Sequence, residues 1–225
     1  MKKTFCLVAM TVASVLLATS MASATIAMYY NGPQGNNSGG VYTYPYQFSL
    51  NGQGNYPLLC DSFYNKISPG DQWNANVLLV SNLNPTNVAS LEFPGVGVTG
   101  YLEASYLFVE EALAYINGNS DPKGLYNWAV WDLFTGQDVS GQNLSQSDEN
   151  QVQAYLAAAL AAGPGLSPSD FPNVVIYTPT DISPDGPQEF FGYGTPGTTP
   201  EPSSLALLGS GVIGLAMVLR RKVKI

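Results

Sequence analysis

Two apolar stretches near the ends of the chain decide how much of it is left to fold. Residues 203–219 are uncharged and mostly apolar, close to the roughly 17 to 25 residues that a membrane-spanning helix needs. A Pro-Glu-Pro triplet precedes them as a stiff spacer, because each proline fixes its own φ and disfavours helix at the residue before it. A basic cluster follows at once, and such clusters stay on the cytoplasmic side. An ordinary membrane anchor is the simplest interpretation.

The order of triplet, apolar stretch and basic end resembles the PEP-CTERM sorting signal of exported proteins from bacteria that make exopolysaccharide. The resemblance covers residues 198–225 and concerns destination only, not activity. It implies an exosortase as partner and a membrane-anchored form with a short cytoplasmic basic tail. Delivery to the cell surface or extracellular matrix would follow. The matching residues are Pro200, Glu201 and Pro202 for the recognition triplet, and Arg220, Arg221 and Lys222 for the basic stop.

The other end has the pattern of a signal peptide. Met1-Lys2-Lys3 is basic, an apolar run follows, and Ala22-Ser23-Ala24 has the small residues of a cleavage site. Cleavage after Ala24 would make Thr25 the first residue of the mature chain. A first membrane anchor is the alternative, but the apolar run is short for one. Residues 1–24 are therefore read as a signal peptide, and 25–197 as one exported domain.

The charge of residues 25–197 excludes several function classes. They hold 15 carboxylates against two lysines, a net charge of −13, so nucleic acid and anionic lipid would be repelled. The chain has no histidine, which removes Ser-His-Asp and Cys-His catalysis and the commonest zinc ligand. No glycine-rich phosphate loop is present. We therefore expect no metal, no cofactor, no nucleic-acid partner and no enzymatic activity.

The hydrophobic pattern predicts an α+β domain, a sandwich-like or barrel-like set of strands with an inserted cluster of about three helices. Residues 25–40 are rich in Gly, Asn and Pro and read as a flexible lead-in. Residues 178–197 are rich in Pro, Gly and Asp and lead to the tail. Period-two runs predict strands at 41–50 (with Pro45 at an edge or break), 56–64, 73–79 and 174–177.

Three helices are expected between the third and fourth strands. One starts near Tyr101 and ends at Gly118, and its inward stripe is Leu102, Tyr106, Val109, Leu113 and Ile116. The second covers 125–134 and is apolar on most sides. The third begins with Ser147 as its N-cap and ends at Gly163-Pro164.

One cysteine lies in the predicted mature chain, since Cys6 belongs to the signal peptide. Cys60, on the predicted second strand, therefore cannot close an internal disulfide. It is either a small buried apolar side chain or a residue with a chemical role.

A second resemblance indicates what the chemical role of Cys60 would be. In thioester domains of bacterial surface proteins, a lone cysteine after a tyrosine-rich strand bonds to a glutamine on a later helix, within a pattern like Thr-Gln-x-Ala-Ile/Val-Trp. The run Tyr-Asn-Trp-Ala-Val-Trp at 126–131 is similar, but Tyr126 and Asn127 stand where the threonine and glutamine would be. The resemblance implies the candidate pair Cys60 and Asn127, with support from Ala129, Val130 and Trp131.

The chemistry of such a pair is a stored electrophile that the amine of a surface partner attacks, with the thiol as leaving group. Asparagine is one methylene shorter than glutamine, so its carbonyl must be brought closer. Gln137 and Gln142 are conceivable substitutes in a Gly-rich loop. The alternative is that Cys60 and Asn127 are unbonded core neighbours.

Two functions follow from these residues. The first is a non-enzymatic surface or matrix protein linked to exopolysaccharide, and adhesive through a degenerate thioester-like domain. The second is a secreted carbohydrate-active enzyme that uses carboxylates only. The missing histidine and the lack of a convincing carboxylate pair favour the first.

Overall fold

The first strand of the fold begins at Thr25. In β1 (Thr25–Pro33) exposed and buried residues alternate, with Ile26, Met28 and Tyr30 pointing inward. This strand pairs with β4 (Tyr46–Leu50) on one side and β6 (Gln72–Leu79) on the other. The expectation of a flexible lead-in at 25–40 is therefore wrong for its first nine residues. The Gly- and Asn-rich composition that suggested it belongs mainly to the segment after Tyr30.

Six antiparallel strands close into a barrel in this computed structural model, which describes residues 25–35, 37–118, 124–183 and 185–194. Their order around the barrel is β1, β4, β5 (Gln53–Cys60), β8 (Phe190–Tyr193), β7 (Val174–Pro179) and β6. A separate two-stranded sheet is formed by β2 (Asn37–Ser38) and β3 (Val41–Tyr42). Pro45 lies between β3 and β4, so the predicted strand 41–50 is broken there.

The inside of the barrel is filled by apolar and aromatic side chains, and Cys60 is one of them. They come from all six strands. The buried members are Ile26, Met28, Tyr30, Tyr46, Phe48, Leu50, Leu58, Cys60, Ala75, Val175, Tyr177 and Phe190.

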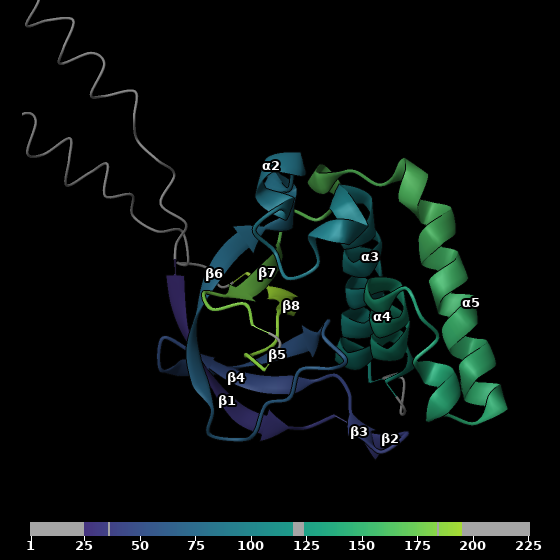
Figure 1. The fold of residues 1–225 in the computed structure, drawn as a ribbon, viewed down its shortest axis with the longest axis horizontal. Coiled ribbons are helices and arrows are strands. Elements are labelled where there is room, and N and C mark those ends of the chain that lie inside the picture. Colours follow the sequence, from purple (N-terminus) through teal and green to yellow (C-terminus); the bar gives the residue numbers. More distant parts are fainter. Residues whose placement is uncertain (1–24, 36, 119–123, 184, 195–225) are drawn as a thin grey trace, which may run out of the picture. The chain divides into compact units, whose positions relative to one another are not determined.

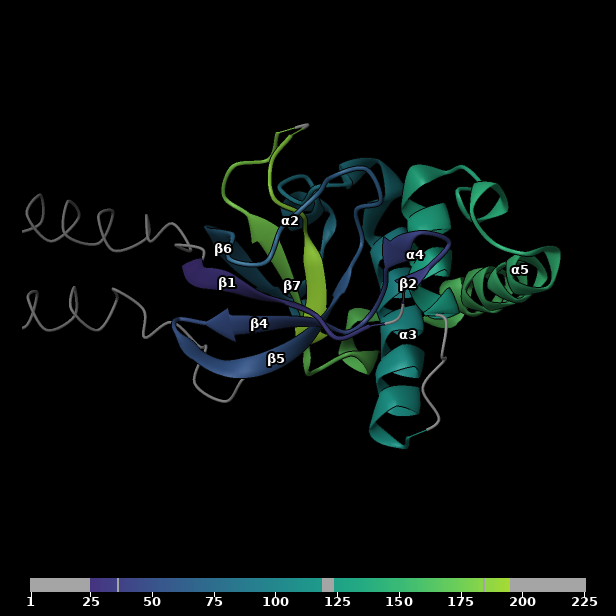
Figure 2. The ribbon, with the colours of Figure 1, turned by 90° about the horizontal axis from the view of Figure 1, so that it is seen from below.

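The helices lie between β6 and β7 in the chain and cover one side of the barrel (Figures 1 and 2). They are α2 (Pro85–Val88), α3 (Gly97–Ile116), α4 (Leu125–Thr135) and α5 (Gln146–Ala162), and α3, α4 and α5 pack on one another. The wall formed by β5, β8 and β7 is thus buried on both faces. Leu59, Ile176 and Phe191 point to the helices. Short 3-10 turns are at Val80–Asn82, Pro94–Val96, Ser140–Gln142, Gly163–Gly165 and Pro168–Asp170.

This architecture confirms the α+β class with an inserted cluster of three longer helices, and it corrects several details. Ser145, not Ser147, caps α5, and its side-chain oxygen accepts from the Asp148 N–H. The predicted stripe of α3 is wrong at its end, because Leu113 and Ile116 are 45% and 69% exposed. Figure 2 shows the last turn of α3 extending beyond the barrel, which removes the surface that would bury them.

The strand β8 was not expected at all. It has four residues inside a segment otherwise rich in Pro, Gly and Asp, yet it pairs with both β5 and β7 and closes the barrel. The surrounding Pro, Gly and Asp residues are typical of a loop, and this composition hid the strand.

No helix among the described residues is long and apolar enough to cross a membrane. The predicted signal peptide 1–24, with Ala24, lies outside the described residues. So do the predicted membrane helix at 203–219, the triplet at 200–202 and the basic stop from Arg220. The division of the chain at these boundaries stays a prediction.

Candidate functional site

Cys60 is the last residue of β5, and the alternation of that strand points its side chain into the barrel. It is fully buried and unpaired. Its thiol donates a hydrogen bond to the Ser62 carbonyl at 3.2 Å. Cys60 pairs in register with Phe190 of β8, so the thiol lies at the seam where the last strand closes the barrel.

Asn127 is positioned by a close approach of the start of α4 to the segment between β3 and β4. The residue before that helix, Gly124, has φ +61°, and a Cβ there would come within 2.1 Å of the Thr43 hydroxyl. Only glycine fits both conditions. Asn127 follows in the first turn of α4, and its side chain is fully buried against the chain segments around Tyr44 and Cys60.

The carboxamide of Asn127 joins those two segments. Its amide nitrogen donates to the Cys60 carbonyl at 2.8 Å, and its oxygen accepts from the Tyr44 N–H at 3.0 Å. Only one orientation of the amide satisfies both partners, since one is a pure acceptor and the other a pure donor. The structure therefore brings Asn127 to Cys60, but the contact it makes is with the backbone.

The Cys60 sulfur is held as a thiol. Burial raises its pKa well above the usual value, and the neighbouring Asp61 carboxyl adds to this. Contacts with the Ser62 backbone and the Trp131 indole act in the opposite direction but are smaller. The buried indole N–H of Trp131 itself meets no acceptor at hydrogen-bond distance. Because the thiolate is the nucleophile, a raised pKa makes this sulfur a poor one.

Aromatic rings shield the pair from water. The Phe63 ring lies 5.5 Å from Trp128 and 5.3 Å from Trp131, and the two indoles are 5.0 Å apart at nearly right angles. Ala129, Val130 and Trp131, the supporting residues of the predicted motif, are all buried in the core between helices and barrel. Gln137 and Gln142 are exposed, so neither lies beside the buried thiol.

A cluster of three carboxyl groups borders the same site, and sequence reasoning missed it. Glu189, fully buried, accepts from the Tyr101 hydroxyl at 2.7 Å, from the Glu92 N–H at 3.2 Å and from the Thr178 hydroxyl. Glu92 accepts from the Glu189 N–H at 2.9 Å and from the Asn65 amide at 3.0 Å. The two glutamates therefore hold each other's backbone in place.

Asp61 is the third member of this carboxyl cluster, and no hydrogen-bond donor among the described residues contacts it. It is fully buried, and neither of its oxygens accepts a hydrogen bond from a described N–H or O–H group. Burial, the charge of Glu189 and that of Glu92 raise its pKa well above the usual value. Burial and Glu189 likewise raise the pKa of Glu92 to about 7. These causes all favour the protonated form of Asp61.

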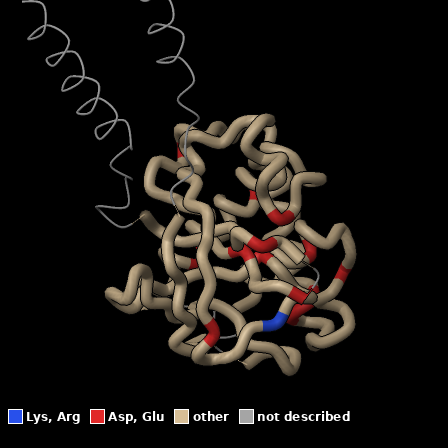
Figure 3. The backbone as a smooth tube through the Cα atoms, turned by 60° about the vertical axis from the view of Figure 1, so that its left-hand side comes forward, with Lys and Arg blue, Asp and Glu red and all other residues tan. Residues whose placement is uncertain are grey.

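The surroundings of this cluster hold almost no compensating charge. Figure 3 shows acidic positions spread over the described part of the chain. Lys66 is the only Lys or Arg among the described residues, and its side chain is exposed. Among the same residues no group of three His, Cys, Asp or Glu side chains is arranged to hold a metal ion. The raised pKa values of Asp61 and Glu92 lower the cost of burying these acids together.

Comparisons with known proteins identify the tail and give the domain a structural likeness. Residues 198–222 match the model of the PEP-CTERM protein-sorting motif, which implies export, exosortase processing and sorting to the cell surface. No curated protein matches the chain in sequence.

Two solved structures are similar to the domain. One is the N-terminal thioester domain of the fibronectin-binding protein SfbI from Streptococcus pyogenes. It has 10% identity and a TM-score of 0.46 over 80% of this chain and 97% of that one. The other is the N-terminal domain of the Streptococcus pyogenes pilus tip adhesin Cpa. It has 12% identity and a TM-score of 0.44 over 79% of this chain and 97% of that one.

Proposed function

We propose that this chain is a non-enzymatic protein of the cell surface or extracellular matrix, linked to exopolysaccharide, whose thioester-like site is degenerate. Export and sorting rest on the tail motif at 198–222. Before processing, the helix at 203–219 would anchor the protein, with the basic stop from Arg220 in the cytoplasm. Cleavage after Ala24 would leave Thr25, which opens β1, as the first residue.

The observation that carries the degenerate site is the hydrogen bonding of Asn127. A thioester would require the Cys60 sulfur to attack the amide carbon of Asn127, with ammonia leaving. Both polar atoms of that amide are instead engaged by backbone partners at 2.8 and 3.0 Å. Attack would remove the amide N–H that donates to the Cys60 carbonyl, and that buried carbonyl would be left without a hydrogen-bond partner. The protonated thiol supports the same conclusion.

The intact mass of the exported protein tests this proposal. We expect a mass equal to that of the processed sequence, no change with methylamine, and one thiol that iodoacetamide labels only after unfolding. A Cys60→Ala variant should give no label, which assigns the thiol. A mass about 17 Da lower, which methylamine raises to about 14 Da above the sequence value as the methylamide forms and the thiol is freed, would show a live thioester and overturn the degenerate site.

The sorting triplet is tested by a deletion in cells. Removal of 200–202 is expected to abolish exosortase processing, so that the protein stays in the membrane fraction as the unprocessed form. Deletion of three residues from the preceding linker, 195–197, serves as a control of equal length and should leave processing intact. Unchanged processing after loss of the triplet would remove the exosortase from the proposal.

A carboxylate-only hydrolase is the second candidate, because a pKa of about 7 at Glu92 lies in the range of a general acid. Against it, Asp61 and Glu189 are fully buried. Two open surface pockets, one on the outer face of the barrel and one beside α4 and α5, contain none of the three carboxyl groups. Sustained release of product from a polysaccharide would favour the hydrolase.

A further inference from the structure

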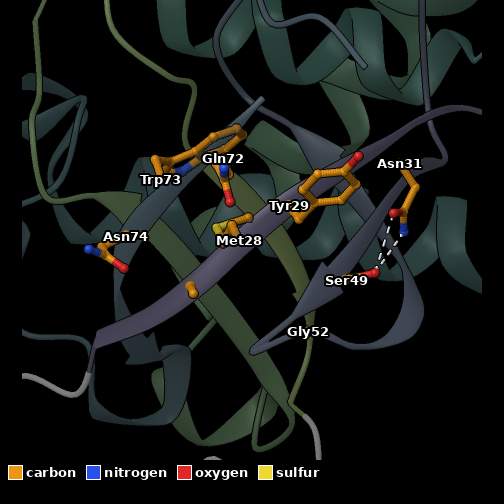
Figure 4. A pocket seen from close by; sticks show the side chains of 9 residues that line it. Met28, Tyr29, Asn31, Ser49, Gly52, Gln72, Trp73 and Asn74 are labelled. Atoms are coloured by element: carbon orange, nitrogen blue, oxygen red, sulfur yellow. Dashed lines mark hydrogen bonds between the residues drawn. The ribbon is translucent and has the colours of Figure 1, made fainter. Parts of the chain in front are cut away.

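The outer face of the barrel over β1 carries an exposed aromatic ring at its centre. Tyr29 is 43% exposed, and its register partners are Ser49 on β4 and Gln72 on β6. Its ring makes no aromatic contact, and its hydroxyl makes no hydrogen bond, with any described residue. Figure 4 shows the ring lying over the middle of the strand, with Asn31 and Ser49 toward one end and Gln72 beside it.

Amide and hydroxyl groups surround this ring. Asn31 donates to the Ser49 hydroxyl at 3.1 Å and to the Asn55 side-chain oxygen at 3.1 Å, which fixes one edge. On the other edge the side chains of Gln72 and Asn74 are exposed and make no hydrogen bond to any described residue. The face therefore offers a fixed polar edge, a bare ring and two amides with unused donors and acceptors.

These residues line an open pocket of about 480 Å³, within the range of roughly 300–1,000 Å³ typical of ligand sites. None of its lining residues is charged. Because β1 is paired on both sides, its backbone offers no free edge to a peptide strand. What the face presents is side chains alone.

The chemistry of this face selects its ligand. An aromatic ring offers a flat apolar surface to the C–H groups of a sugar, and neighbouring amides exchange hydrogen bonds with its hydroxyls. A cation would need a carboxylate, and the lining has none. An anionic chain would be repelled by a domain of net charge −13. An uncharged, hydroxyl-rich ligand meets neither objection.

We propose that the outer face of β1 binds a neutral glycan, with a pyranose ring stacked on Tyr29 and its hydroxyls bonded to Gln72, Asn74 and the Asn31–Ser49 edge. This site deepens the proposed function and rests on it, since it would supply the contact with exopolysaccharide. The binding is non-covalent and independent of Cys60, which lies inside the barrel.

The test is a titration of the full chain, purified in a detergent without a sugar headgroup. The neutral probes are maltohexaose, cellohexaose, laminarihexaose and mannohexaose, and a mannuronate hexamer is the anionic probe. We expect at least one neutral hexamer to bind and the mannuronate hexamer not to bind. Tyr29→Ala should weaken binding about tenfold, through loss of the stacking surface. Tyr29→Phe keeps the ring and should stay within about threefold of the unaltered protein.

Tyr64→Ala is the matched control, because that tyrosine is 62% exposed but lies outside the pocket. It should bind as the unaltered protein does. The proposal is overturned if no neutral hexamer binds, if Tyr29→Ala binds normally, or if the mannuronate hexamer binds equally well. Processing in cells and the state of the thiol are measured separately. A protein that is correctly processed, carries a free thiol and binds no neutral hexamer would therefore reject this site alone.

Discussion

Replacement of Asn127 by leucine is expected to lower the free energy of unfolding by about 2–4 kcal/mol. Leucine has a similar size but no polar atoms, so the Cys60 carbonyl and the Tyr44 N–H would both stay buried without partners. Each unsatisfied buried group costs about 1–3 kcal/mol. Urea denaturation followed by tryptophan fluorescence measures the change, because Trp128 and Trp131 lie in the same core.

A matched control is Gln137→Leu, an amide-to-leucine change at an exposed position just after α4. It should change stability by no more than about 0.5 kcal/mol. If Asn127→Leu were as mild as this control, the two backbone groups would have found other partners. The role of Asn127 as the link between α4 and the barrel would then be wrong.

The stability of the domain is expected to fall as the pH rises from about 4.5 to about 7. The pKa of Glu92 is raised from 4.5 to about 7, and that of Asp61 is raised as well. In this window the folded protein holds protons that the unfolded chain has released. The stabilisation that these two groups contribute is therefore fully present below pH 4.5 and is lost as the pH rises to about 7. For Glu92, which is partly reached by solvent, the loss is about 1–3 kcal/mol.

Chemical denaturation at a series of pH values measures this slope, and two variants assign it. Glu92→Gln removes one titrating group and should flatten the profile. Asp138→Asn removes the same charge at an exposed carboxylate whose pKa is lowered by hydrogen bonds from Ser140 and Gly141, so it should leave the fall in place. Stability that is constant or rising between pH 4.5 and 7 would show that the pKa values of Glu92 and Asp61 are not raised in the folded protein.

The fold could be predicted from the sequence where the pattern is long and local. The strand at 73–79 and the helix at 125–134 lie within a residue of where the structure places them. Failures have physical causes. Composition after Tyr30 hid the alternation of β1, and the Pro, Gly and Asp residues around β8 hid that strand. The exposed end of α3 depends on where its neighbours stop, which no property of α3 encodes.

The candidate site, like the fold, could be predicted from the sequence only in part. A resemblance in local pattern pointed to Cys60 and Asn127, and the structure places them in contact, yet the hydrogen bonds to backbone groups could not be read from residue types. The carboxyl cluster left no signal at all. Asp61, Glu92 and Glu189 come from three separate segments, and only the tertiary fold brings them together.

The position of β8 in the chain constrains the order of folding. Its two neighbours, β5 and β7, both carry unpaired edges until β8 arrives, and Tyr193 stands only five residues before the matched tail at 198–222. Nearly the whole domain must therefore have been synthesised before the barrel can close. Until then its interior and two strand edges are open to other chains, a known route to aggregation. Completion of the barrel therefore needs residues that come only just before the sorting tail in the chain.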